Sequence, residues 1–202
     1  EIPAFPHINR VYHLENGVDQ FFGDSPFHVE EKLDGYNTRI FQHGGEIYTT
    51  TKGGFICPFT TEWARLWGEI ANLYKFYADH PEWLICAEVA GHNPYNSQRD
   101  PDMPDGARLF IFDLMDDQGN YLDPEERYRV MDHYDLPGVP RYGEYSMESL
   151  DDLMLLLQNL NQKDREGVVM KSSRKDQYLK FVTPRSDIKD IQDNIILHFD
   201  TH

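Results

Sequence analysis

The spacing of hydrophobic and polar residues changes several times along the chain, which indicates short strands mixed with amphipathic helices. Alternating or continuous apolar runs predict strands at 27–33, 37–42, 45–50, 83–89, 108–115, 167–171 and 178–182. Apolar residues at helical spacing predict helices over 60–79, 123–134, 146–160 and 184–199. The proline- and glycine-containing segment 1–26 is predicted to be loop, apart from a short helix near 18–22.

This order of elements favours an α+β domain with largely antiparallel sheets. The sequence holds no internal repeat and no glycine-rich phosphate loop of the Rossmann or P-loop type, so those folds are disfavoured. One helix start is well marked, because Asp123 stands at the N-cap, Pro124 at the first helical position and Glu126 at the third.

Composition adds limits to this picture. The 202 residues are 40% hydrophobic and 13% aromatic, enough for a sizeable core in one domain or in one domain with a small appendage. No apolar run reaches the length of a membrane span, and Cys57 and Cys86 are isolated, which favours a reducing, cytoplasmic compartment. The net charge of −16 argues against a broad nucleic-acid-binding surface and leaves room only for a local basic pocket.

The stretch from Glu31 to Arg39 carries the first candidate chemistry. Lys32 ends a predicted strand, and Asp34-Gly35 follows it. One interpretation is a hairpin whose Asp-Gly supplies the positive φ angles of a tight turn. The other is that Lys32 is a nucleophile presented at a strand end, with Arg39 binding phosphate nearby.

Later strands carry further polar residues, each with a structural and a functional interpretation. Glu88 closes an apolar strand, where a carboxylate is either exposed or paired with a ligand or a cation. Phe112 is either core or a platform for a base. Lys171 and Lys180 either pack their stems and extend their heads to water, or direct both ammonium groups at a phosphate.

Taken in order, these stretches resemble one family. Lys-x-Asp-Gly-x-x-x-Arg, a glutamate strand, Phe-Asp, Glu-Gly-x-x-x-Lys and a final lysine strand are similar to the covalent nucleotidyltransferases, which are ATP-dependent DNA and RNA ligases and mRNA capping enzymes. Two segments, Glu-Lys-Leu-Asp-Gly-Tyr-Asn-Thr-Arg-Ile and Thr-Lys-Gly-Gly-Phe-Ile-Cys-Pro-Phe, are most similar to the archaeal-type ATP-dependent RNA ligases. The resemblance implies a nucleotidyltransferase (ATP-grasp-like ligase adenylation) domain over 1–182, with antiparallel sheets flanked by helices, followed by a C-terminal helix over 183–202.

The resemblance also implies roles for individual residues. Lys32 would become adenylylated, and Glu166 would lie near Mg²⁺ or Mn²⁺. Nucleotide-binding roles are implied for Arg39, Lys52, Glu88, Phe112, Lys171 and Lys180. The implied reaction has three steps: lysyl-AMP formation from ATP, transfer of AMP to an RNA 5′-phosphate, and sealing by a 3′-OH.

The family pattern leaves some alternatives open. Its final motif often reads Lys-x-Lys, and Tyr178 stands at the first of those positions here. The implied partners are ATP and single-stranded or nicked RNA ends, with no membrane, and dimerisation is expected only if a C-terminal domain exists. Whether 183–202 begins such a domain is open. A DNA ligase, a capping-type enzyme and a non-catalytic module that binds nucleotides or nucleic-acid ends remain alternatives.

Overall fold

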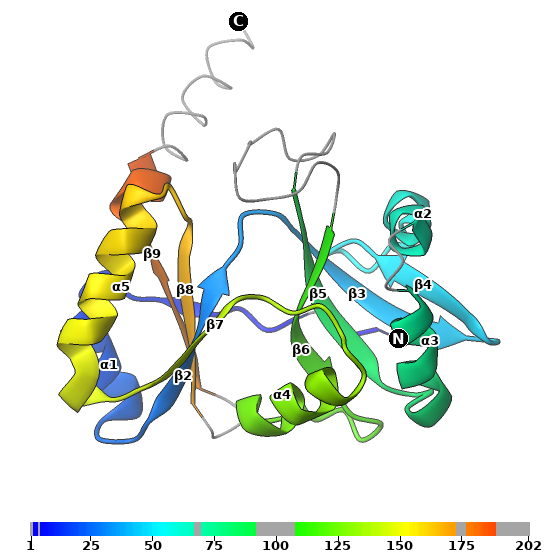
Figure 1. Cartoon of the computed structure of the whole chain (residues 1–202), viewed down its shortest axis with the longest axis horizontal. Coiled ribbons are helices and arrows are strands. Elements are labelled where there is room, and N and C mark those ends of the chain that lie inside the picture. The colour runs from blue at the N-terminus through cyan, green and yellow to red at the C-terminus, as the bar shows by residue number, and fades with distance from the viewer. Residues whose placement is uncertain (1, 4, 67–69, 92–107, 173–176, 189–202) are drawn as a thin grey trace, which may run out of the picture. The chain divides into compact units, whose positions relative to one another are not determined.

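The computed structural model describes residues 2–3, 5–66, 70–91, 108–172 and 177–188. The chain divides into two compact units (Figure 1). Unit 1 consists of Glu1–His7 and Gly35–Val139, and unit 2 consists of Ile8–Asp34 and Pro140–His202. Each predicted strand is present in one unit or the other, and the helices and mainly antiparallel sheets confirm the α+β fold class.

Unit 2 is built on a five-stranded sheet in the order β1-β9-β8-β2-β7. All neighbours are antiparallel except β1 and β9. Helices α1 and α5 pack together over one face of this sheet (Figure 1). The strands are β1 (Asn9–Arg10), β2 (Phe27–Lys32), β7 (Arg141–Tyr145), β8 (Gly167–Ser172) and β9 (Tyr178–Val182), and the helices are α1 (Leu14–Phe22), the 3₁₀ turn η1 (Met147–Ser149) and α5 (Leu150–Gln162).

The core of unit 2 lies between the sheet and the two helices. Apolar side chains alternate along β2, β8 and β9, so one face of the sheet meets the leucines of α5 and the apolar side of α1. The buried set is Val11, Val18, Phe22, Phe27, Val29, Leu153, Leu157, Leu160, Val168, Met170 and Leu179. The intervening residues of the three strands therefore point to the opposite face.

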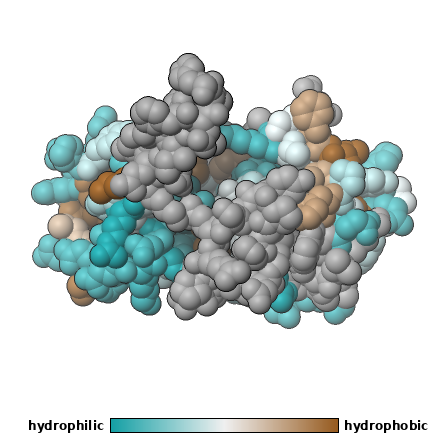
Figure 2. Space-filling model, turned by 90° about the horizontal axis from the view of Figure 1, so that it is seen from above, coloured by the Kyte–Doolittle hydropathy of each residue, from teal (hydrophilic) through white to brown (hydrophobic). Residues whose placement is uncertain are grey.

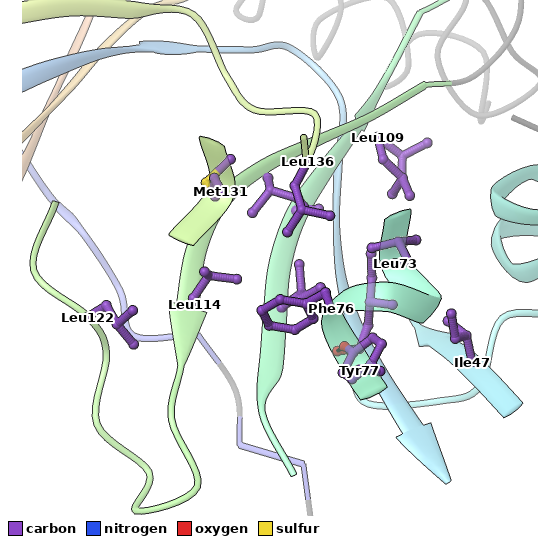
Figure 3. Packing of buried hydrophobic residues seen from close by; sticks show 14 residues of the cluster. Ile47, Leu73, Phe76, Tyr77, Leu109, Leu114, Leu122, Met131 and Leu136 are labelled. Carbon is purple, nitrogen blue, oxygen red and sulfur yellow. Dashed lines mark hydrogen bonds between the residues drawn. The ribbon is translucent and has the colours of Figure 1, made fainter. Parts of the chain in front are cut away.

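Unit 1 is built on an antiparallel four-stranded sheet in the order β4-β3-β5-β6. Helix α3 (Ile70–Asp79) packs against the apolar face of this sheet through Phe76 and Tyr77 (Figure 3). The Tyr77 hydroxyl donates a hydrogen bond to the Ile40 carbonyl at 2.7 Å. The elements are β3 (Tyr36–His43), β4 (Glu46–Thr50), α2 (Pro58–Leu66), α3 (Ile70–Asp79), β5 (Leu84–Ala90), β6 (Arg108–Met115) and α4 (Pro124–His133).

Several elements differ from the prediction. Strand β1 and residues 14–17 of α1 lie in the segment predicted to be loop, and β7 lies where no element was predicted. β7 is a short edge strand that contains a glycine, and its only apolar positions are two partly buried tyrosines. The range predicted as one helix over 60–79 corresponds to α2, which begins earlier at Pro58, and to α3, and residues 67–69 between them lie outside the described residues. Residues 184–188 are helical, and the rest of the predicted C-terminal helix lies outside the described residues.

The hairpin interpretation of Asp34-Gly35 is wrong, because β2 and β3 belong to different sheets. Gly35 does not adopt a positive φ angle. A Cβ atom at this position would lie 2.3 Å from the carbonyl oxygen of Val89. Glycine is therefore required by the close approach of two backbone segments.

Among the residues that Figure 2 colours, hydrophilic ones predominate, with hydrophobic residues in small groups between them. Among the described residues, the most exposed large apolar ones are Phe55 and Tyr12, at 76% and 72% exposed. Among the described helices, none combines the length and the apolar character needed to cross a membrane.

Candidate active site

Lys32 is the last residue of β2, on the face of the unit 2 sheet opposite α1 and α5. The strand register pairs Lys32 with Gly167, and Lys180 with Val169. Because side chains alternate along a strand, Lys171, four residues after Gly167, points to the same face. The structure therefore gathers the three amines predicted from the sequence, those of Lys32, Lys171 and Lys180, on one face of one sheet.

The ammonium of Lys32 forms an ion pair and a short hydrogen bond with the carboxylate of Glu166. Both side chains are partly exposed, at 25% and 15%. Glu166 immediately precedes β8, and the Thr183 N–H donates to its carbonyl at 2.9 Å. The predicted nucleophile and the predicted metal-binding carboxylate are thus in direct contact.

Gly167 allows β8 to begin at this point. Its φ angle is +151°, and a Cβ atom there would lie 2.0 Å from the carbonyl oxygen of Phe181 on β9. No other residue fits without displacing β9 or Glu166. The glycine of the Glu-Gly motif therefore has a packing reason that follows from the β8–β9 contact.

Lys171 is buried more deeply than its predicted role suggests. Its side chain is 1% exposed, and its ammonium lies 2.9 Å from Glu30 Oε2 and 5.1 Å from the centre of the Tyr178 ring. The contact with Oε2 is an ion pair without hydrogen-bond geometry. Lys171 is therefore held beside Glu30, whereas Lys180, on the next strand, is partly exposed.

In unit 1, Arg39 and Glu88 share the sheet face that points away from the core. The register pairs Arg39 with Cys86, and Asn37 with Glu88, which in turn faces Phe110 on β6. Two neighbouring rows of side chains therefore cross this face. One row contains Asn37, Glu88 and Phe110, and the other contains Arg39 and Cys86.

Arg39 is a buried cation with unused hydrogen-bond donors. Its residue is 2% exposed, and its Nε and Nη1 atoms have no hydrogen-bond partner among the described residues. The amide oxygen of Asn37 is also buried without a partner there. Such groups are costly to bury unless something else satisfies them, so this face has the donors and acceptors to hold a polar ligand with anionic oxygens.

The two remaining predicted residues have different surroundings. Phe112 lies at a bulge of β6, and its ring meets Phe5 edge-on, with 5.0 Å between the ring centres. Lys52 is exposed on the turn after β4, where the Gly54 N–H donates to the Thr51 carbonyl at 3.0 Å. Phe112 is therefore half-buried beside an aromatic neighbour, and Lys52 is free to reach solvent.

Residues 25–182 match the family model described as RNA ligase. The chain belongs to the RNA ligase family. An uncharacterized protein of Methanocaldococcus jannaschii is 29% identical over 206 residues, which cover 98% of this chain and 51% of that protein.

This RNA ligase family member is also similar in structure to solved proteins. A putative ATP-dependent DNA ligase from Aquifex aeolicus is 35% identical, with a TM-score of 0.90, over 100% of this chain and 55% of that one. An archaeal ATP-dependent RNA ligase (form 1) is 34% identical, with a TM-score of 0.85, over 94% of this chain and 50% of that one. The chain thus spans about half the length of these relatives.

Some residues that share a sheet face or a contact with the predicted site residues were not predicted from the sequence of this RNA ligase family member. Asn37 lies inside the Lys-x-Asp-Gly-x-x-x-Arg stretch, two residues before Arg39, so strand alternation could have placed it on the same face. Phe110 could have been found in the same way from Phe112. Glu30, the partner of Lys171, gave no signal, because the two residues are far apart in the sequence.

Proposed function

We propose that this chain is the nucleotidyltransferase part of an ATP-dependent RNA ligase. The observation that carries the proposal is Lys32, partly exposed at the end of β2 beside Glu166, in a chain of the RNA ligase family. Nζ of Lys32 would attack the α-phosphorus of ATP, forming a phosphorus–nitrogen bond and releasing pyrophosphate. The AMP would then pass to the 5′-phosphate of an RNA end, and a 3′-OH would displace it to form the phosphodiester bond.

The predicted binding residues of each unit have proposed roles. In unit 1, Glu88 would accept a hydrogen bond from a ribose hydroxyl, Phe112 would stack on adenine, and Arg39 and Lys52 would contact phosphate or ribose oxygens. In unit 2, Lys180 and Lys171 would neutralise charge that builds up on the phosphate during transfer. The unpartnered donors of Arg39 support this assignment on the unit 1 face.

Glu166 is the residue of unit 2 that would hold Mg²⁺ or Mn²⁺. Its carboxylate is partly exposed and offers the oxygen ligand that Mg²⁺ prefers, and Mg²⁺ commonly takes its other ligands from phosphates and water. When bound, the metal ion would neutralise phosphate charge. Lys32 would have to release a proton and leave Glu166 before its nitrogen attacks.

DNA ligation is the second candidate, because the matched protein of Aquifex aeolicus carries the name of a putative DNA ligase. Both activities would use the same lysyl-AMP and differ in the strand that receives it. We further propose that the protein acts in the cytoplasm, which its free thiols Cys57 and Cys86 support.

The test is to follow the transfer of labelled AMP. The protein is incubated with Mg²⁺ and ATP labelled at the α-phosphate, and then chased with 5′-phosphorylated RNA or DNA of the same sequence, single-stranded or nicked. We expect label from ATP and not from GTP, and we expect it to move to the RNA. Transfer only to nicked DNA would favour a DNA ligase. Labelling from GTP would favour a capping-type enzyme. Reversible ATP binding without an adduct would favour a non-catalytic module.

A further inference from the structure

Glu31 lies immediately before Lys32 and points to the opposite face of the sheet. Its side chain is 5% exposed, and both carboxylate oxygens are used. The Tyr142 hydroxyl donates to Oε2 at 2.5 Å, and Arg165 Nη1 donates to Oε1 at 3.2 Å. Burial, together with the hydrogen bond to Glu31, raises the pKa of Tyr142 above its usual value of 10.0.

Arg165 is itself fixed, and it lies immediately before Glu166. The hydroxyl of Thr183 donates to the Arg165 carbonyl at 2.7 Å, and the Thr183 N–H donates to the Glu166 carbonyl at 2.9 Å. Thr183 is completely buried and immediately follows β9. The main chain that carries Arg165 and Glu166 is therefore held from one side by a single threonine.

Two consecutive pairs of residues thus meet across the sheet with opposite charges. Glu31 pairs with Arg165 on the face toward the helices, and Lys32 pairs with Glu166 on the other face. The Glu31 N–H also donates to the Pro140 carbonyl at 2.9 Å. The end of β2, where a strand would otherwise fray, is therefore held on both sides and on both faces.

We propose that Arg165 is a positioning residue for Lys32, acting through Glu31 and supported by Tyr142. This inference rests on the proposed function. The Glu31–Arg165 pair fixes the β2 end against the start of β8, and so holds Nζ of Lys32 in the place from which it attacks. Arg165 has no contact with ATP in this account.

The expected effect is on rate more than on binding. Misplacing a reacting group by about 1 Å can lower a rate by about 100-fold. Replacing Arg165 by methionine keeps much of the side-chain bulk but removes the ion pair. We therefore expect adenylylation at saturating ATP to slow by about 10- to 100-fold, with the ATP concentration for half-maximal rate changed by less than about threefold.

The experiment compares Arg165→Met, Arg165→Lys, Glu31→Gln and Tyr142→Phe in single-turnover labelling with ATP. Arg185→Met is the matched control, because Arg185 pairs with Asp164 at 3.3 Å in the same unit but both side chains are largely exposed. Rate constant and final labelled fraction are measured separately, since a merely unstable protein loses labelled fraction while the rate of its folded part is unchanged. Arg165→Lys is expected to recover part of the rate.

Amide hydrogen exchange of the same variants, without ATP, gives a readout that does not depend on the proposed function. Arg165→Met should speed exchange at residues 30–33 while the first residues of β2 stay protected. Faster local exchange together with a slower rate constant supports the proposal. Wild-type rate constants in both Arg165→Met and Tyr142→Phe, or exchange unchanged at 30–33, would overturn it. If wild-type protein takes no label at all, the proposed function fails, and exchange still decides whether Arg165 fixes the strand end.

Discussion

Replacing Glu30 by alanine is expected to lower the free energy of unfolding by about 3–5 kcal/mol. Glu30 and Lys171 face each other at 2.9 Å with side chains 2% and 1% exposed, so alanine would leave a buried ammonium without its carboxylate. Removing one member of a buried ion pair is far more destabilising than removing both. The measurement is urea denaturation followed by circular dichroism.

Two controls make this result specific to the buried charge. Glu144→Ala removes a carboxylate on the neighbouring strand that is 53% exposed and lies 3.8 Å from His28, and it should change stability by less than about 1 kcal/mol. The double variant Glu30→Leu with Lys171→Met should be more stable than Glu30→Ala, because no unpaired charge remains. If Glu30→Ala were as stable as Glu144→Ala, the ion pair would not contribute as described.

Replacing Gly167 by alanine is expected to lower the free energy of unfolding by about 3 kcal/mol or more. Two costs combine: the positive φ angle costs about 1–3 kcal/mol, and the forced overlap costs a further 1–3 kcal/mol. The overlap is with the Phe181 carbonyl, 2.0 Å from the added Cβ. Because Glu166 is the preceding residue, the folded fraction should also form the lysyl-AMP more slowly.

Gly143 supplies the comparison for this prediction. It lies on β7 of the same sheet with φ +101°, and a Cβ atom there would meet nothing within 4 Å. Gly143→Ala therefore tests the backbone angle without the overlap, and its loss should be about 1–2 kcal/mol. Equal losses at both positions would show that the approach of β9 is not the reason for glycine at 167.

The strands that carry Lys32, Glu88, Phe112, Lys171 and Lys180 could be predicted because apolar alternation is a local property of the sequence. The same alternation predicts which residues of one strand share a face. It cannot show which strands join in one sheet. The local signal of Asp34-Gly35 is the same for a hairpin and for a chain that passes from one sheet to another, and only the contact of Gly35 with Val89 separates the two.

Partners that are distant in the sequence account for most of what was not predicted. Arg165 and Glu31 are 134 positions apart, and nothing near either residue indicates the other. The burial of Lys171 depends in the same way on Glu30. Strand β7 was missed for a different reason, because it is a five-residue edge strand in which a glycine and two charged residues leave only Tyr142 and Tyr145 as an apolar signal.

The central claim is that Lys32 forms a covalent bond with AMP. The most direct measurement is mass spectrometry of the protein after incubation with ATP and Mg²⁺, first intact and then as peptides. We expect one AMP per chain, attached to the peptide that contains Lys32, and no adduct on a folded Lys32→Ala variant. AMP on another residue, or a folded wild-type protein that stays unmodified, would contradict the account.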